Sequence, residues 1–458
     1  MTSVRTLLRG GDVITSRVAG ELLTGTDVLV ENGRITAIGR DLAAGDAQVV
    51  DLAGRVVLPG FVDTHRHTWQ SVVRNIASDW SLTEYLAGLH TGMSRHYRAE
   101  DTYAGNYLGA LEALDSGITT LVDWSHNLFT PEHADAAIQA LRDAGLRAVF
   151  AHGGGAQQWG APLPSAVPHP DDARRVRNQH FTSESDLVTM ALALRGPQFT
   201  TPEVNLHDFG LAKELDLDVT VHVGDGYWGK SGPIRAMQRD GLLSDRTTYV
   251  HCCTLGDDEL AMIADSGGKA SVAPDVEMQM GHGFPATGRL IRAGVRPSFS
   301  IDVCSSNGGD MFGTMRSAIG VQRALDNAPA VETGEVIERI GLTCSEVLMF
   351  ATRDGAVAAG LGDRTGSIEV GKAADIVALR GDSLAMLPMN NPIGAVVYNA
   401  HPGLVQDVWV DGRRVKEDGR LVGVDVAAVR ALAERTRDHV VSAYPEASLG
   451  GGWHPELG

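Results

Sequence analysis

The chain has 458 residues, of which 43% are hydrophobic and 21% are charged, so it is long enough for one large domain and a smaller second one. Its formal net charge of -18 disfavours nucleic acid and anionic membrane surfaces as partners, because both need a basic face. Its four cysteines form no C-x-x-C pair, and no apolar stretch has the length of a membrane span, so we expect a cytoplasmic protein.

Residues 1–58 have the pattern of a small β domain. Short segments rich in β-branched residues alternate there with glycine and polar turns, which is typical of strands. The predicted strands are Gly11–Thr15, Asp27–Glu31, Arg34–Ile38 and Gln48–Asp51, and Arg55–Pro59 leads into the next part of the chain.

Residues 59–365 alternate strand-like runs with helix-like stretches. Such alternation over about 300 residues predicts a parallel sheet, and the length suits a (β/α)₈ TIM barrel of the α/β class. The predicted strands are Gly60–Asp63, Thr119–Asp123, Arg147–Ala151, Asp218–His222, Thr248–His251, Ala270–Ala273 and Pro297–Ile301, and predicted helices include Asp101–Ser116, Ala134–Ala144, Glu203–Glu214 and Asp257–Ser266. Residues 153–180 are rich in Gly, Pro and Ala and predict a long loop over one barrel face.

Strand-like segments return in residues 366–425. The predicted strands are Ser367–Val370, Asp375–Leu379, Ala395–Tyr398 and Val405–Val410. The simplest interpretation is one small β-sandwich domain built from both chain ends, with residues 1–58 as its first part. Residues 426–458 are expected to form a C-terminal helix, over Val426–Tyr444, and a tail.

A histidine pair follows the first predicted barrel strand, in the motif Asp63-Thr64-His65-Arg66-His67. Residues i and i+2 of a strand point the same way, so His65 and His67 could share a metal ion at the barrel axis. Two histidines of a surface loop would explain the motif equally well if it stood alone.

Further polar residues end other predicted barrel strands and strengthen the metal hypothesis. His222, His251 and Asp302 each follow an apolar run. Barrel active sites lie at these strand ends, so the side chains are expected to converge. Three imidazoles and a carboxylate suit one divalent metal, Zn²⁺ first and Fe²⁺ second, with water in an open position.

These residues occur together with motifs that resemble the amidohydrolase superfamily. The resemblance covers about residues 1–425, and it is closest to the branch that contains cytosine and guanine deaminases and triazine hydrolases. The segments that carry it, besides the histidines, are Val57–Asp63, Ile76–Leu86 and Gly366–Val377.

The resemblance implies a role for each of these polar residues. His65, His67, His222 and Asp302 would hold the metal, and Asp302 would also accept the proton of the attacking water. His251 would bind the water or the substrate. Asp225 stands where the family usually has a Glu proton shuttle, and the shorter side chain puts its reach in doubt. Members with two metals use a carboxylated lysine on the fourth strand, and this chain has no lysine before Lys213, so one metal is expected.

Aromatic and polar residues after several predicted strands are candidates for substrate contacts. They could line a pocket for a flat ring, although ordinary packing under a loop explains the aromatic residues about as well. The candidates are Trp69, Gln70, His126, His152, Gln157, Trp228, Asp275 and Glu277. The two carboxylates among them suggest a substrate that is cationic or donates hydrogen bonds.

The functional hypothesis is hydrolysis of a C–N bond in a small nitrogen-rich compound, with deamination of a heterocycle by metal-activated hydroxide as the first choice. The alternatives are ring opening of a cyclic amide or imidazolone, hydrolytic dehalogenation, and a non-catalytic scaffold of the same fold. The expected partner is a small heterocyclic substrate, with neither nucleic acid nor membrane, and a homo-oligomer is expected from the resemblance.

Overall fold

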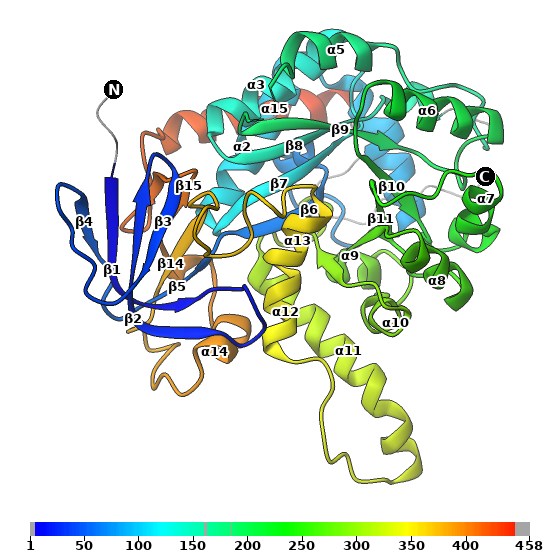
Figure 1. Cartoon of the computed structure of the whole chain (residues 1–458). Coiled ribbons are helices and arrows are strands. Elements are labelled where there is room, and N and C mark those ends of the chain that lie inside the picture. Colours follow the sequence, from blue (N-terminus) through cyan, green and yellow to red (C-terminus); the bar gives the residue numbers. More distant parts are fainter. Residues whose placement is uncertain (1–4, 160–162, 184, 445–458) are drawn as a thin grey trace.

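The computed structural model describes residues 5–159, 163–183 and 185–444, without the side chains of 158 and 159. Its centre is a sheet of eight parallel strands in the spatial order β13-β12-β11-β10-β9-β8-β7-β6 (Figure 1). The strands are β6 (Phe61–Arg66), β7 (Ile118–Ser125), β8 (Arg147–His152), β9 (Val188–Leu194), β10 (Val219–Val223), β11 (Thr247–His251), β12 (Lys269–Val272) and β13 (Pro297–Phe299).

The residues after β13 return to β6 and nearly close the sheet into a barrel. Arg66 and Asp302 form a parallel bridge, the Asp302 N–H donates to the carbonyl of His65, and the His67 N–H donates to that of Asp302. The predicted TIM barrel is therefore confirmed, and its closure places His65, His67 and Asp302 side by side.

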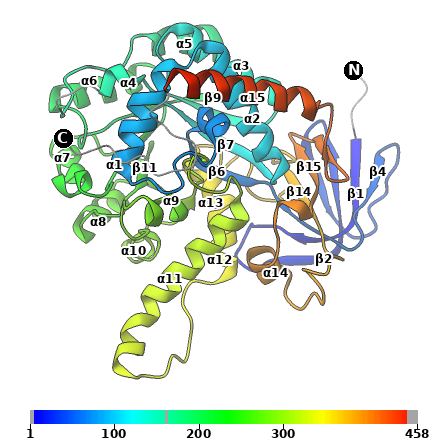
Figure 2. The ribbon, with the colours of Figure 1, turned by 180° about the vertical axis from the view of Figure 1, so that it is seen from behind.

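Helices cover the outside of the barrel, as Figures 1 and 2 show. The helices are α1 (Leu82–Tyr85), α2 (Ala99–Asp115), α3 (Pro131–Ala144), α4 (Ala156–Trp159), α5 (Asp172–His180), α6 (Pro202–Glu214), α7 (Pro233–Arg239), α8 (Asp257–Asp265), α9 (Pro274–Gln279), α10 (Thr287–Ala293), α11 (Met311–Thr333), α12 (Cys344–Phe350) and α13 (Arg353–Ala358). The inward faces of α2, α3, α5 to α8 and α10 to α12 join the strands in one large apolar core, while α1 and α9 contribute Tyr85 and Val276 to a second, smaller one. The helix α11 and the chain after it project away from the body of the molecule (Figure 1).

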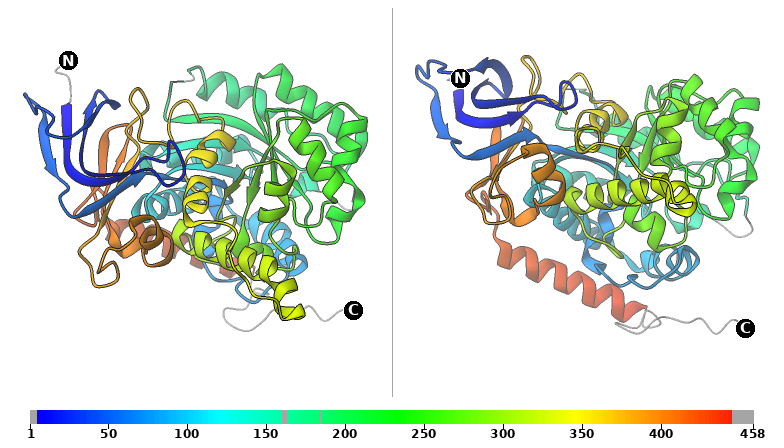
Figure 3. Two further views of the ribbon diagram at one scale, coloured as in Figure 1. Left: turned by 60° about the horizontal axis from the view of Figure 1, so that its bottom comes forward. Right: turned by 90° about the horizontal axis from the view of Figure 1, so that it is seen from below.

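Strands from both chain ends form a second sheet beside the barrel, as predicted (Figure 3). Its strands are β1 (Arg5–Ile14), β2 (Leu22–Glu31), β3 (Arg34–Gly39), β4 (Gln48–Asp51), β5 (Arg55–Pro59), β14 (Ile376–Arg380), β15 (Val405–Val410), β16 (Arg413–Glu417) and β17 (Arg420–Leu421). The two ends meet where β5 pairs with β14 in antiparallel orientation. Since β6 follows β5 after one residue, the sheet is joined directly to the first barrel strand.

A buried ion pair fastens this sheet to the barrel. The Arg147 guanidinium, at the start of β8, donates to both carboxylate oxygens of Asp375, at 2.7 and 3.1 Å, and to Asp411 at 2.9 Å. The Thr365 hydroxyl and the Asp411 N–H also donate to Asp375, so each of its oxygens has two partners. Asp375 belongs to the segment whose resemblance to the amidohydrolases was noted in the sequence.

Four segments differ from the sequence prediction. The barrel strand β9 was not predicted, because Val188–Leu194 reads VTMALAL and its Met, Ala and Leu favour helix as well as strand. Ser367–Val370 is irregular and not a strand. Ala395–Tyr398 lies in helix α14 (Pro392–Tyr398), which Asn391 caps and whose first residue is proline. The predicted loop 153–180 contains the helices α4 and α5; its residues 160–162 lie outside the described residues.

The C-terminal helix α15 (Val426–Ala443) lies against α2, close to its predicted position (Figure 2). It buries Thr436 and Val440 and leaves its other face in solvent. Residues 445–458 of the predicted tail lie outside the described residues. Among the residues that the structure describes, no helix combines the length and the apolar character that crossing a bilayer requires.

Candidate metal and active site

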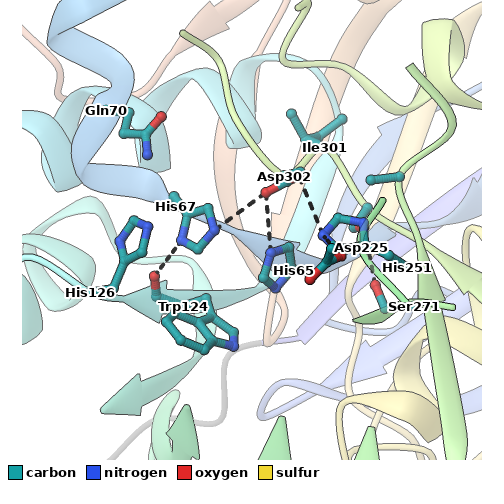
Figure 4. Close-up of polar contacts among 12 residues, drawn as sticks. His65, His67, Gln70, Trp124, His126, Asp225, His251, Ser271, Ile301 and Asp302 are labelled. Atoms are coloured by element: carbon teal, nitrogen blue, oxygen red, sulfur yellow. Dashed lines mark hydrogen bonds and ion pairs between the residues drawn. The ribbon is translucent and has the colours of Figure 1, made fainter. Parts of the chain in front are cut away.

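The residues predicted as metal ligands converge at one end of the barrel. Figure 4 shows three of them, His65, His67 and Asp302, side by side. His65 and His67 come from the end of β6, and His222 comes from β10. The ring centroid of His65 lies 4.7 Å from that of His67 and 4.8 Å from that of His222. The Asp302 Oδ1 atom lies 3.2 Å from His65 Nε2 and 3.4 Å from His67 Nε2.

Three groups of three residues could each hold an ion, with the ligand atoms of a group within 4.8 Å of one another. The groups are His65, His67 and Asp302; His65, His222 and His251; and Asp225, His251 and His282. Neighbouring groups share His65 or His251, so the three form one continuous cluster. This arrangement fits the predicted set of three imidazoles and one carboxylate, and it places His251 beside that set.

The histidines are held in the form that binds metal. The His67 Nδ1–H donates to the Trp124 carbonyl at 2.8 Å, so the lone pair on Nε2 faces Asp302. Burial lowers the pKa of His65, lowers that of His67 to about 3, and lowers that of His222 well below its usual value. The imidazoles are therefore neutral at physiological pH, as metal ligation requires.

Unpaired buried atoms at the centre also fit a bound ion. The Nδ1 atoms of His65 and His222 are buried without a hydrogen-bond partner in the described part of the chain. Burial would raise the pKa of the Asp302 carboxyl, but the imidazoles of His65 and His251 hold it well below its usual range. A carboxylate and neutral imidazoles in one buried cluster are a donor set for a divalent transition metal.

His251 and Asp225 form a polar pair next to this centre. The His251 Nδ1–H donates to Glu277 Oε1 at 3.1 Å, while its Nε2 atom lies 3.6 Å from Asp225 Oδ1 and 3.8 Å from Asp302 Oδ2. Burial alone would lower the pKa of His251, but the carboxylates of Asp225 and Glu277 raise it to about 9. The amide of Gln198 donates to Asp225 Oδ2 and leaves Oδ1 facing His251.

The backbone is strained at two of these strand ends. His251 has φ 74° and Asp302 has φ 62°, values that residues other than glycine adopt at a cost of about 1–3 kcal/mol. Both residues turn out of their strands at these points, and their side chains enter the cluster. Strain of this kind concentrates at functional sites.

A partly open cavity lies above the cluster. Its accessible volume is about 40 Å³, room for about three water molecules. The side chains around it are His67, His126, His222, Asp225, His251 and Asp302 from the barrel, Leu82, Tyr85, Leu86 and His90 from the segment after β6, and Phe199, Met280, His282 and Val303 from later loops. The segment after β6 contains α1 and a π-helical turn, Leu86–Gly92, and it covers the cavity.

Of the predicted substrate contacts, His126 alone lines this cavity. Its ring stacks on His67 with centroids 3.8 Å apart. Trp69 stands behind it and donates from Nε1 to His126 Nδ1 at 2.9 Å. Gln70 is also one layer back, where its amide donates to the Tyr85 hydroxyl at 2.6 Å. Trp69 and Gln70 therefore support the cavity wall and do not form its surface.

Three more predicted contacts lie away from the cavity surface. The His152 ring is hydrogen-bonded to that of His169 at 3.0 Å. Gln157 is exposed on α4. Trp228 is half-buried behind Phe199, with ring centroids 6.1 Å apart. These positions correct the prediction: a place after a barrel strand does not by itself turn a side chain inward.

The helix α9 separates the two predicted carboxylates. Residues two apart on a helix point about 200° apart. Asp275 accepts hydrogen bonds from Thr314 and Ser317 of α11, so it faces away from the site, while Glu277 faces His251. The prediction that Asp275 contacts the substrate is therefore corrected. Glu277 contacts His251 and does not form part of the cavity surface.

Sequence reasoning missed several cavity residues. His90 lies in the π-helical turn and Phe199 in an irregular segment, where no simple period gives the direction of a side chain, and Tyr85 ends the four-residue helix α1. His282 had a visible signal, since it stands between Gly281 and Gly283. Gln198 follows β9, the strand that was not predicted, and its role was hidden for that reason.

Known proteins resemble this chain over nearly its whole length. The family described as "Amidohydrolase family" matches residues 56–415. A 5'-deoxyadenosine deaminase of Methanothermobacter thermautotrophicus is 30% identical over 442 residues, which cover 93% of this chain and 97% of that protein. A 5-methylthioadenosine/S-adenosylhomocysteine deaminase of Symbiobacterium thermophilum is 30% identical over 430 residues, 90% of this chain and 94% of that protein.

Solved structures have the same fold. An adenosine deaminase from Xanthomonas campestris with bound zinc has a TM-score of 0.83 at 27% identity and covers 96% of this chain and 99% of its own. An atrazine chlorohydrolase from Arthrobacter aurescens complexed with zinc has a TM-score of 0.82 at 25% identity, and the alignment covers 94% of this chain and 100% of that one. The match to the family and the extent of these alignments lead to one conclusion: the chain belongs to the amidohydrolase family.

Proposed function

We propose that the protein is a metal-dependent aminohydrolase that deaminates a heterocycle and releases ammonia. The observation that carries this proposal is the buried cluster of His65, His67, His222 and Asp302 beneath a partly open cavity, with Asp225 and His251 beside it. The names of the deaminase relatives support the reaction type.

We further propose one divalent metal, with zinc as the first choice and Fe²⁺ as the alternative. Two structural neighbours contain zinc, and three imidazoles with one carboxylate suit it. The fourth barrel strand, β9, contains no lysine that could bridge a second ion. When bound, the ion supplies Lewis-acid activation of water for attack on an sp² carbon.

The side chains around the centre have complementary tasks. Asp302 accepts the proton of the attacking water, because its carboxylate lies among the proposed ligands. Asp225 passes a proton to the ring nitrogen or to the leaving amine from Oδ1, while Gln198 fixes Oδ2. His251, oriented by Glu277, donates from Nε2 to the developing negative charge. Water and the amino compound thus give the oxo compound and ammonia.

Ammonia release tests the proposal. The zinc-loaded protein is incubated with a panel of purines, pyrimidines, pterins and aminotriazines, and ammonia and products are quantified. We expect ammonia from at least one class. Chloride release or a ring-opened product without ammonia would instead support dehalogenation or cyclic-amide hydrolysis, the alternatives that the same cluster could serve.

The alternative to an enzyme is a non-catalytic scaffold protein of the same fold. All four proposed ligands are present in this chain, which speaks against it. Metal analysis separates the two, since a scaffold would purify without stoichiometric metal. The homo-oligomeric state and the cytoplasmic location stay predictions, and size-exclusion chromatography with light scattering tests the first of them.

A further inference from the structure

A histidine outside the proposed ligand set points into the cavity from the loop after α9. His282 lies between Gly281, with φ 83°, and Gly283, with φ 134°. Its backbone N–H donates to the Glu277 carbonyl at 3.1 Å, and its carbonyl accepts from the Gly226 N–H at 2.9 Å. The two glycines permit the sharp turn, and the backbone bonds fix the loop that carries His282 to the loop that carries Asp225.

The side chains of His282 and Asp225 face each other with free polar atoms. The His282 Nδ1 atom lies 3.6 Å from Asp225 Oδ1, and the His282 ring lies 4.6 Å from that of His251. Both ring nitrogens of His282 and the Oδ1 atom of Asp225 are buried without a hydrogen-bond partner among the described residues. Burying such an atom is unfavourable unless a ligand satisfies it. The pair is therefore built to meet a polar molecule in the cavity.

The charges around the cavity restrict that molecule. No lysine or arginine side chain lines it, and every lysine and arginine of the chain lies within the residues that the structure describes. Asp225 and Asp302 line the cavity, and Glu277 is buried directly behind His251. These three carboxylates carry three negative charges, whereas one divalent ion carries two positive charges. A proton on His251 would bring the sum only to zero. No positive charge is therefore left to pair with an anionic substrate.

We propose, on the basis of the deaminase function above, that the substrate is a heterocycle rich in N–H donors and free of anionic groups, and that Asp225 and His282 bind its edge. An amino group next to a ring nitrogen offers the donor that Asp225 Oδ1 accepts. The neighbouring ring atom then meets His282. A phosphate or carboxylate in the same space would be a buried charge without a partner, which proteins avoid.

Matched pairs of substrates test the charge restriction. Ammonia release by the zinc-loaded protein is compared for each neutral panel compound that reacts and its ring-carboxylated derivative, such as cytosine and 5-carboxycytosine. We expect kcat/KM for the anionic member to be lower by about 100-fold or more, the size of effect that an uncompensated buried charge produces. Equal rates within a pair would overturn the proposal and leave the deaminase function intact. Failure of every neutral compound on the panel would contradict the deaminase function itself.

Variants test the residues. His282→Asn and, should it fold poorly, His282→Gln are expected to raise KM for the neutral substrate about tenfold, the effect of losing one polar contact of about 1.4 kcal/mol, with zinc content unchanged. His401→Asn is the control, because His401 is exposed on the sheet domain. Unchanged KM and kcat in well-folded His282 variants would remove His282 from the proposal.

A charge insertion provides the converse test. Leu82 lines the cavity from α1, and Leu82→Arg adds a cation there. We expect this variant to reduce the ratio of kcat/KM between cytosine and 5-carboxycytosine by at least about tenfold, since the ring carboxylate gains a partner. An unchanged ratio in a folded, zinc-containing variant would contradict the charge argument.

Discussion

Two buried aspartates of this protein have opposite surroundings. Both oxygens of Asp375, between the barrel and the sheet domain, accept two hydrogen bonds each, and the Arg147 guanidinium neutralises the charge. Asp225 lines the cavity above the metal cluster. Gln198 donates a hydrogen bond to one of its carboxylate oxygens, and the other oxygen has no hydrogen-bond partner among the described residues. The carboxylate of Asp375 is fully paired without a ligand, and that of Asp225 is not.

The difference separates a structural from a functional use of the same side chain. A buried polar group that is fully paired stabilises one fold, whereas an unpaired one must serve some other purpose to be retained. Of the side chains with unpaired atoms among the described residues, His222, Asp225 and His282 line the cavity, and His65 lies beside it in the cluster. Four predictions test this distinction.

The largest effect is expected from the proposed ligands. His65→Ala and Asp302→Ala should each lower ammonia release by several orders of magnitude and reduce bound zinc, because each removes a donor from the centre. Elemental analysis and initial rates measure the two effects. His401→Ala is the matched surface control. Near-normal rates in both ligand variants would end the assignment of the metal site.

The next effect concerns the unpaired aspartate. Asp225→Asn keeps the shape and removes the proton-carrying carboxylate, so kcat should fall by about 10²–10⁴-fold. Zinc content and unfolding temperature should stay near those of the unmodified protein. Turnover unchanged by this substitution would mean that another group carries the proton.

The paired aspartate should respond in the opposite way. Asp375→Asn leaves the Arg147 charge buried with an incomplete partner and should lower the free energy of unfolding by about 3–5 kcal/mol. Urea denaturation followed by tryptophan fluorescence measures it. The rate per folded, zinc-loaded molecule should remain unchanged. A large loss of rate without loss of stability would reverse the contrast between the two aspartates.

The smallest effect is expected at Gln198, which donates a hydrogen bond to Asp225. Gln198→Ala removes the hydrogen bond to Asp225 Oδ2 and should lower kcat about tenfold, as expected for a hydrogen bond to a charged group. In the double variant with Asp225→Asn the effects should not add, because Gln198 acts through Asp225. Full additivity would show that Gln198 acts independently.

Much of the fold and of the metal cluster could be predicted from the sequence. Parallel strands bring their carboxyl ends to one rim, so polar residues after apolar runs were expected to meet, and His65, His222 and Asp302 do so. The amidohydrolase family is confirmed by the match to residues 56–415. The catalytic and ligand roles of these residues stay predictions until the variants above are measured.

The cavity lining could not be predicted in the same way. Asp275 and Glu277 were expected to act together, but the helical turn of α9 sends them in opposite directions. His282 enters the cavity because two glycines with positive φ turn its loop inward. Whether Tyr85 and Phe199 reach the cavity depends on how the segments that carry them pack above the barrel.

The sequence by itself determined the alternation of strands and helices, the order of the histidines and aspartate at the strand ends, and the family. Only the tertiary structure decided which loop side chains form the cavity and which buried polar atoms remain unpaired. The reason is physical: strand direction follows from a local period of two residues, whereas the direction of a loop side chain depends on backbone turns and contacts between distant segments.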